Sequence, residues 1–242
     1  MSQTLLKSIV LPQAGSSKAT ATVIFAHGLG DQGAGWLDVA QMLRKRPKLQ
    51  HVRFVLPNSP VQPVTLNGGM PMPSWFDIRT LDDISGGEDE VGLRKSADAL
   101  SALINAEEAG SQEHLDGQGV PSERVVVGGF SQGGAIGLLC GLTHPKPVAG
   151  IVGLSTWLPL RAKMVAPYLT SHARNIPIFL GHGTADQVVK YEYGQRSAKF
   201  LRAGGENDGG AGSYDGMAHS ACMEEIEHVA EYLEKVIPAQ AS

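Results

Sequence analysis

The chain has 242 residues, of which 42% are hydrophobic and 18% are charged, enough apolar content to bury the core of one α/β domain over residues 1–242. Its formal net charge is −4 at pH 7 and its charges are mixed, without a basic block, so no nucleic acid is expected as a partner. The sequence shows no signal-like segment, no apolar run of membrane-spanning length and no lipidation signal, so we expect a soluble, cytoplasmic protein.

Apolar runs of strand length alternate with segments whose apolar residues are spaced as on one face of a helix. The expected strands cover residues 20–26, 52–56, 124–127, 148–154 and 176–181. The apolar stripes of two expected helices are Leu93, Ala97, Leu100 and Ile104, and Cys222, Ile226, Val229, Leu233 and Ile237. This alternation predicts an α/β fold, with a mostly parallel central sheet and helices on both of its faces.

The first expected strand leads into a loop in which Gly28, Gly30 and Gly33 spell G-x-G-x-x-G. A dinucleotide site would also need an acidic residue about twenty positions later, at the end of the next strand, to bind the ribose. That neighbourhood reads HVRFVLPNSP and holds no Asp or Glu. An acyl-transfer enzyme uses such a loop for a backbone N–H that binds an oxyanion, and we prefer this interpretation.

Residues 57–90 interrupt the alternation of strands and helices. The segment is rich in proline and glycine, has no helical or strand period, and is longer than ordinary connecting loops. We expect it to be a lid or a binding loop. Its acidic end, DDISGGEDE, is typical of a solvated face. A second glycine-rich run, at 204–213, predicts a flexible turn before a short strand.

The run Gly129-Phe130-Ser131-Gln132-Gly133 matches G-x-S-x-G between a buried strand and an apolar helix. In this context the pattern predicts a sharp strand-to-helix turn that raises the serine oxygen above the sheet. Glycines are needed at its two ends because side chains there would collide with neighbouring backbone. Ser131 is therefore the candidate nucleophile, and a purely structural tight turn is the alternative.

A serine nucleophile needs a base and an acid that orients this base, and in this kind of fold both follow the serine, acid first. Asp186 lies just beyond the carboxyl end of an expected strand, where open α/β sheets hold their sites. Asp208 and Asp215 are alternatives, and Asp186 could also serve only as a helix cap. His219 stands in a loop before the last helix, whereas His228 falls within that helix, so we choose His219 as the base.

Seven sequence blocks, in order along nearly the whole chain, resemble the acyl-protein thioesterase and lysophospholipase family of α/β-hydrolases. The blocks are FAHGLGDQGAGW, PSWFDI, GEDEVGL, GGFSQGGA, LSTWLPL, HGTADQVV and YDGMAHS. Together they are far more specific than G-x-S-x-G alone. The resemblance implies cleavage of acyl thioesters from S-acylated proteins and of acyl esters in lysophospholipids and small esters, with no cofactor and no metal. Such substrates are compatible with transient contact with a membrane surface.

The resemblance also implies roles for particular residues. The catalytic triad would be Ser131, Asp186 and His219, and the backbone N–H groups of Leu29 and Gln132 would bind the oxyanion. The residues expected against the acyl chain are Met72, Trp75, Phe76, Ile78 and Leu81. Two rival interpretations are a general carboxylesterase for short-chain esters and a non-catalytic binding module with a hydrolase fold.

Overall fold

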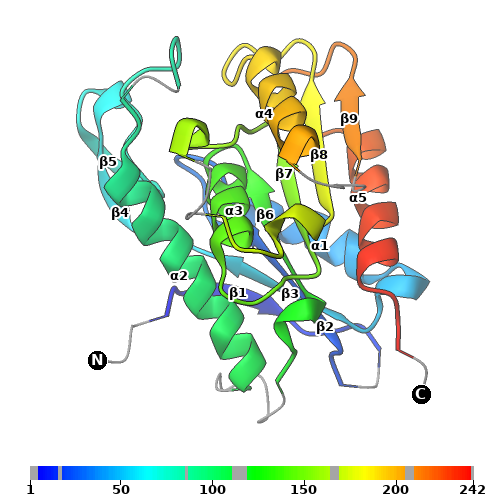
Figure 1. The fold of residues 1–242 in the computed structure, drawn as a ribbon. Helices are drawn as coiled ribbons and strands as arrows, with labels where there is room; N and C mark the ends of the chain where they lie inside the picture. Colours follow the sequence, from blue (N-terminus) through cyan, green and yellow to red (C-terminus); the bar gives the residue numbers. More distant parts are fainter. Residues whose placement is uncertain are drawn as a thin grey trace.

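The recurring apolar runs form the strands of a central sheet. The computed structural model describes residues 5–15, 18–84, 87–110, 119–163, 169–204 and 210–240. The strands of the sheet are β1 (Ser8–Leu11), β2 (Ala21–Ala26), β3 (Val52–Pro57), β6 (Val125–Phe130), β7 (Gly150–Leu154), β8 (Ile178–Gly183) and β9 (Ala211–Tyr214). Within the described residues their order is β1-β3-β2-β6-β7-β8-β9, and every neighbouring pair is parallel except β1 with β3 (Figure 1).

The predicted mostly parallel sheet is confirmed, and each of the five expected strands is found within a few residues of its expected bounds. β3 and β7 are buried along their whole length, as continuous apolar runs are when both faces of a sheet are covered. The short antiparallel strand β1 was not expected. It lies at the sheet edge and is only partly buried, so its sequence lacks the long apolar run that marks the central strands.

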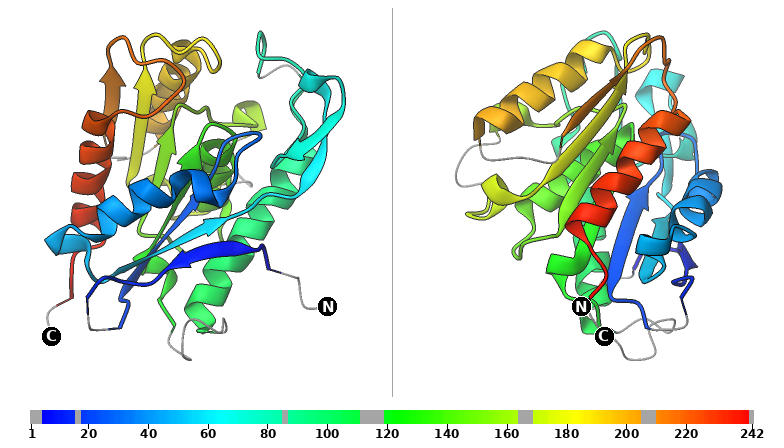
Figure 2. Two further views of the ribbon diagram at one scale, coloured as in Figure 1. Left: turned by 180° about the vertical axis from the view of Figure 1, so that it is seen from behind. Right: turned by 90° about the vertical axis from the view of Figure 1, so that its right-hand side faces the viewer.

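Helices cover both faces of the sheet, as predicted. They are α1 (Leu37–Arg44), α2 (Glu90–Ala109), α3 (Gln132–Thr143), α4 (Tyr191–Gly204) and α5 (Met223–Val236). Figures 1 and 2 show α2, α3 and α4 on one face and α1 and α5 on the other, and each group packs on its own cluster of buried side chains. Among the described residues, none of the helices combines the length and apolar character that a membrane span requires.

The long helix α2 shows how local sequence sets the ends of these elements. The Asp89 side chain accepts a hydrogen bond of 3.0 Å from the Gly92 N–H and so caps the first turn. Gly110 ends the helix with φ 61°, a left-handed conformation that glycine adopts without a steric penalty. The predicted stripe of Leu93, Ala97, Leu100 and Ile104 is buried along the face between these ends.

Residues 57–90 contain a β-hairpin, which corrects the expectation of a segment without strand structure. β4 (Val61–Val64) pairs antiparallel with β5 (Met70–Pro73), and Gly68 and Gly69 turn the chain between them with φ 66° and 78°. The hairpin stands apart from the main sheet, close to the carboxyl ends of its strands (Figure 1). Its sequence, VQPV and MPMP, hides the strand period because proline has no N–H for a ladder and is rare in central strands.

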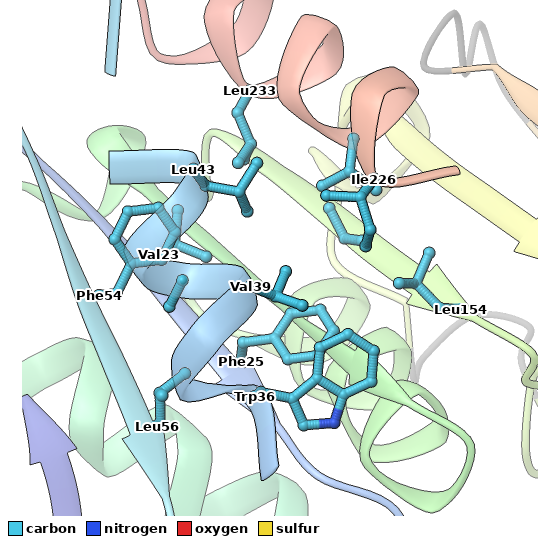
Figure 3. Close-up of a pocket in the computed structure, with 13 residues that line it drawn as sticks. Val23, Phe25, Trp36, Val39, Leu43, Phe54, Leu56, Leu154, Ile226 and Leu233 are labelled. Carbon is cyan, nitrogen blue, oxygen red and sulfur yellow. The ribbon is translucent and has the colours of Figure 1, made fainter. Parts of the chain in front are cut away.

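A narrow apolar slot of about 20 Å³ lies between α1 and α5, over the side chains of the sheet (Figure 3). Val23 and Phe54 of the sheet, Leu43 of α1 and Ile226 and Leu233 of α5 are among its walls. Its lining carries no polar surface. The slot therefore lacks the polar groups that orient a substrate in a ligand site.

A buried acid, Glu225, lies in the first turn of α5. It is completely buried, and neither carboxylate oxygen has a hydrogen-bond partner among the described residues. Burial raises its pKa to about 8 from a usual value of 4.5. Between these two pH values the folded protein keeps a proton that the unfolded chain has lost. Stability therefore falls as the pH rises through this range.

We expect Glu225→Gln to remove this loss. The variant should match the wild type near pH 5 and exceed it at pH 8 by an unfolding free energy on the order of a few kcal/mol. Urea unfolding at the two pH values measures the difference. The matched control is Glu224→Gln, an exposed neighbour whose substitution should leave the pH dependence unchanged. An equal effect of Glu225→Gln at both pH values would contradict the buried, protonated carboxyl.

Candidate active site

Ser131 stands at the junction between β6 and α3, at the carboxyl edge of the sheet. Its backbone has φ 54° and ψ −120°, a conformation that residues with side chains rarely adopt and that costs on the order of 1–3 kcal/mol. At this junction Gly129 and Gly133 closely approach β2. A Cβ atom on either glycine would lie within 3.0 Å of the Ala26 carbonyl oxygen. The predicted need for glycine at both ends of the turn is confirmed.

Three loops bring the predicted triad together. Ser131 follows β6, Asp186 follows β8, and His219 lies between β9 and α5. His219 Nε2 is 3.0 Å from Ser131 Oγ, and His219 Nδ1 is 2.7 Å from Asp186 Oδ2. The serine is 8% exposed and the aspartate 2%. This is the geometry of a nucleophile hydrogen-bonded to a base that an acid orients in turn.

The Asp186 carboxylate is held on both of its oxygens. The Val188 and Val189 N–H groups donate to Oδ1 at 2.9 Å each, while His182 Nε2 lies 3.4 Å from Oδ2. Burial alone would raise the pKa of Asp186, but hydrogen bonds with His182 and His219 outweigh burial and hold this pKa well below its usual range. Asp186 is therefore ionised at neutral pH and can orient the His219 ring.

The alternative acids and base lie in other surroundings. Asp215 is exposed and accepts a hydrogen bond of 3.0 Å from the Thr184 hydroxyl. Asp208 lies outside the described residues. His228 is on α5 as expected, with Nδ1 3.0 Å from the Tyr214 hydroxyl. The array around Ser131 thus contains Asp186 and His219 and neither of the described alternatives.

The two residues expected to donate oxyanion N–H groups flank Ser131. Gln132 is the first residue of α3, so its N–H has no acceptor within the helix. Leu29 lies in the loop after β2 and lines the same pocket as Ser131 and His219. The glycine-rich loop therefore lies beside the candidate nucleophile, where an oxyanion donor is required.

His27 is a functional candidate that the sequence analysis missed. Its Nε2 accepts the Ser59 N–H at 3.1 Å, so Nδ1 carries the proton and donates it to the Gly28 carbonyl at 2.7 Å. Burial lowers the pKa of His27 and favours this neutral ring. Across a trans peptide, the Gly28 C=O and the Leu29 N–H point in opposite directions. His27 therefore fixes the orientation of the Leu29 N–H, and its place directly before a glycine-rich turn was the signal for this role.

A pocket of about 220 Å³ opens beside Ser131 and His219. Its apolar walls come from the segment 57–90, from the end of β6 and from the loops after β2, β7 and β8. The apolar side chains among its lining residues are Leu29, Leu66, Ile78, Leu81, Phe130, Trp157, Val188 and Val189. Two of the five residues expected to contact an acyl chain, Ile78 and Leu81, are in this wall.

The other three expected acyl-binding residues do not line this pocket. Trp75 is 1% exposed and Phe76 3%, and both belong to the buried core. Met72 lies in β5, where its sulfur accepts a hydrogen bond of 3.2 Å from the Asn67 side chain. The composition of the segment showed that apolar residues were present, but it could not show that the two aromatic rings point inward.

Phe130, the residue before Ser131, contacts the candidate base. The centre of its ring is 4.7 Å from that of His219. Behind it, Trp36 lies 5.5 Å from Phe130 and 4.6 Å from Phe25. Figure 3 shows Phe25 and Trp36 at the edge of the apolar slot. These three rings pack in a row against one side of His219. The sequence did not predict this packing, because Phe130 occupies a position of G-x-S-x-G that the motif leaves variable.

Comparison with known proteins places this geometry in a family. Residues 9–237 match the model of the phospholipase/carboxylesterase family. The chain is 60% identical to acyl-protein thioesterase 1 of Mycosarcoma maydis over 98% of this chain and 99% of that protein. It is 48% identical to acyl-protein thioesterase 1 of Cryptococcus neoformans over 88% of this chain and 91% of that protein.

Solved structures show the same fold. Acyl-protein thioesterase 2 of Zea mays superposes with a TM-score of 0.79 at 30% identity, over 96% of this chain and 99% of that one. Arabidopsis thaliana SOBER1 superposes with a TM-score of 0.78 at 28% identity, over 91% of this chain and all of that one. The family match and these relatives, together with the fold, show that the chain belongs to the phospholipase/carboxylesterase family of α/β-hydrolases.

Proposed function

We propose that the protein is a serine hydrolase that cleaves acyl thioesters from S-acylated protein cysteines, with activity on lysophospholipids and other carboxylic esters. The observation that carries the proposal is the hydrogen-bonded array of Ser131, His219 and Asp186 at the mouth of an apolar pocket. The names of the relatives, acyl-protein thioesterases at up to 60% identity, support the thioester as the substrate bond. We also propose that the protein acts in the cytoplasm.

The geometry supports a two-step reaction. Ser131 Oγ attacks the acyl carbonyl carbon while its proton passes to His219 Nε2, and the Leu29 and Gln132 N–H groups bind the resulting oxyanion. The intermediate collapses, the carbon–sulfur bond breaks, and the thiolate leaves with the proton from His219. A water molecule then attacks the acyl-enzyme as His219 takes its proton; the bond from the acyl carbon to Ser131 Oγ breaks, His219 returns the proton to Oγ, and the fatty acid leaves. Asp186 stays ionised throughout and stabilises the imidazolium.

A second candidate function is hydrolysis of short-chain esters alone. The pocket of about 220 Å³ is smaller than the roughly 300–1,000 Å³ of ordinary ligand pockets, and this size favours a short acyl group. A long chain would fit only if it extended along the lid segment past Ile78 and Leu81. Activity as a function of acyl length therefore separates the two candidates.

We expect Leu81→Asp to lower kcat/KM for a long-chain thioester at least about tenfold, because a charge in the pocket wall opposes burial of methylenes worth up to about 0.8 kcal/mol each. An acetyl ester, which ends before this wall, should change by less than about threefold. Steady-state kinetics on both substrates measure the difference.

The matched control is Val91→Asp, which adds the same charge on an exposed face of α2. It should leave both substrates unaffected. Equal losses on the two substrates by a folded Leu81→Asp protein would mean that the lid supports the triad rather than the acyl chain. A wild type active only on the acetyl ester would favour the short-chain esterase.

A further inference from the structure

Residues 73–76, here called the brace, connect the hairpin to the pocket wall and lie against the loop after β2. The Gly30 N–H donates to the Pro73 carbonyl at 2.8 Å, and the Trp75 indole N–H donates to the His27 carbonyl at 2.8 Å. Leu29, one of the two proposed oxyanion donors, lies between these two tethered positions. Two residues of the brace are thus hydrogen-bonded to the loop that carries the first donor, one on each side of that donor.

The brace is also fixed to the second donor, through the side chain of the same residue. Gln132 Oε1 accepts the Trp75 N–H at 3.0 Å, and Gln132 Nε2 donates to the Phe76 carbonyl at 2.6 Å and to Ser74 Oγ at 3.1 Å. The Gln132 side chain is completely buried. Because one residue supplies both the amide that holds the brace and the backbone N–H of the second proposed donor, a displacement of the brace acts directly on that donor.

The brace is rigid on its remaining sides. The Ser96 hydroxyl of α2 donates to the Trp75 carbonyl, and Ser74 Oγ donates to the Phe76 carbonyl at 2.7 Å. Trp75 and Phe76 are packed in the core, so their rings cannot leave without opening a cavity. A segment of the lid therefore has the burial and hydrogen bonding of a core element, and it spans the two loops of the oxyanion site.

We propose that the brace sets the positions of the two oxyanion N–H groups relative to each other, and that Gln132 and Trp75 act through it as positioning residues. The inference rests on the proposed serine hydrolase function. It gives Trp75 a role different from acyl-chain contact: the loss of the brace lowers the rate for short and long substrates alike. Ile78 and Leu81, which follow the brace in the chain, sort substrates by length.

The expected size of the effect comes from the geometry that an oxyanion donor needs. Donor atoms must lie about 2.7–3.1 Å from the oxyanion, and removing one donor costs on the order of 10²–10³ in kcat. A shift of about 1 Å in the reacting groups can cost about a hundredfold. When the brace is displaced, both N–H donors are still present but are shifted. The loss of kcat should therefore be smaller than the loss caused by deleting one donor.

Gln132→Met tests the proposal, because it keeps the backbone N–H and most of the side-chain volume but removes every hydrogen bond of the amide. We expect kcat to fall about ten- to a hundredfold on both an acetyl ester and a long-chain thioester, with KM within about threefold. The affinity for an alkyl boronic acid, which forms a tetrahedral adduct with the serine, should fall by the same factor. A milder variant, Ser74→Ala, should lower kcat about three- to tenfold. It keeps the proposal testable if Gln132→Met does not fold.

Tyr232→Phe is the matched control for lost stability. Its hydroxyl donates to the Pro177 carbonyl at 2.8 Å and accepts the Ile151 N–H at 3.0 Å. These contacts lie at the amino ends of β7 and β8, whereas Ser131 lies at the carboxyl ends of the strands. It should lower the melting temperature as Gln132→Met does and leave kcat within about twofold. One outcome would overturn the role of the brace and leave the proposed function standing. In it, the wild type is active, and folded Gln132→Met and Ser74→Ala both keep kcat within twofold of the wild type. A wild type that neither hydrolyses esters nor reacts with a fluorophosphonate would overturn the proposed function itself.

Discussion

Ser131→Ala is expected to lower kcat by on the order of 10⁶, the loss seen when a serine hydrolase loses its nucleophile. The reason is geometric. Among the described residues, Ser131 Oγ is the hydroxyl hydrogen-bonded to His219 Nε2. The nearby Thr156 hydroxyl donates instead to the Ser131 carbonyl at 2.7 Å, so it is turned toward the backbone and away from the base. Thr156 is therefore not in position to replace the nucleophile.

Thioester hydrolysis and fluorophosphonate labelling measure this loss together. The wild type should carry one label, located on Ser131 by mass spectrometry, and the variant should carry none. Ser220→Ala is the control, because Ser220 is an exposed serine next to His219 and should be dispensable. A Ser131→Ala protein that keeps more than about a tenth of wild-type activity would exclude Ser131 as the nucleophile.

His219→Ala should lose kcat to within about tenfold of the serine variant, because base and nucleophile act as a unit and either deletion disables both. The backbone N–H donors remain, so a small residual rate over the uncatalysed reaction is expected. Fluorophosphonate labelling should slow by a comparable factor, since an unactivated serine reacts poorly.

The control for this variant is His228→Ala. His228 lies on α5 and bonds to the Tyr214 hydroxyl, remote from Ser131 in the hydrogen-bond network, so its loss should leave kcat nearly unchanged. The reverse pattern, with His228 essential and His219 dispensable, would mean that the loop before α5 does not supply the base.

The central sheet was predictable because its inner strands are continuous apolar runs, which are stable only when both faces of the strand are buried. The sequences of β3 and β7 predict buried parallel strands, and the structure has buried parallel strands at both places. β4 and β5 were not predictable in this way, because each contains proline, one in β4 and two in β5, which has no N–H for a ladder and is rare in central strands. β1 is too short and too exposed to stand out from a loop.

The candidate site divides in the same manner. Ser131, Asp186 and His219 could be located from sequence because their roles require fixed places after strands and before helices. The pocket wall could not be predicted, because all four residues Trp75, Phe76, Ile78 and Leu81 are apolar and the sequence does not show which side chains point into the core and which into the pocket. His27 and the Gln132 amide were missed for a related reason: each makes a hydrogen bond to a backbone atom of a segment distant in sequence, and in His27 it is this bond, from the Ser59 N–H, that fixes which ring nitrogen carries the proton.

The neutral His27 ring has a consequence for how activity responds to acid. Its Nε2 accepts the Ser59 N–H, so an added proton on Nε2 would set two donors against each other and break this contact, while Nδ1 still donates to the Gly28 carbonyl. Burial keeps this proton off at a pH where an ordinary histidine would bind it. The contact between His27 and Ser59 thus persists at a pH that would protonate an ordinary histidine. Protonation of His27 should therefore not limit activity until the pH falls below the range in which an ordinary histidine binds its proton.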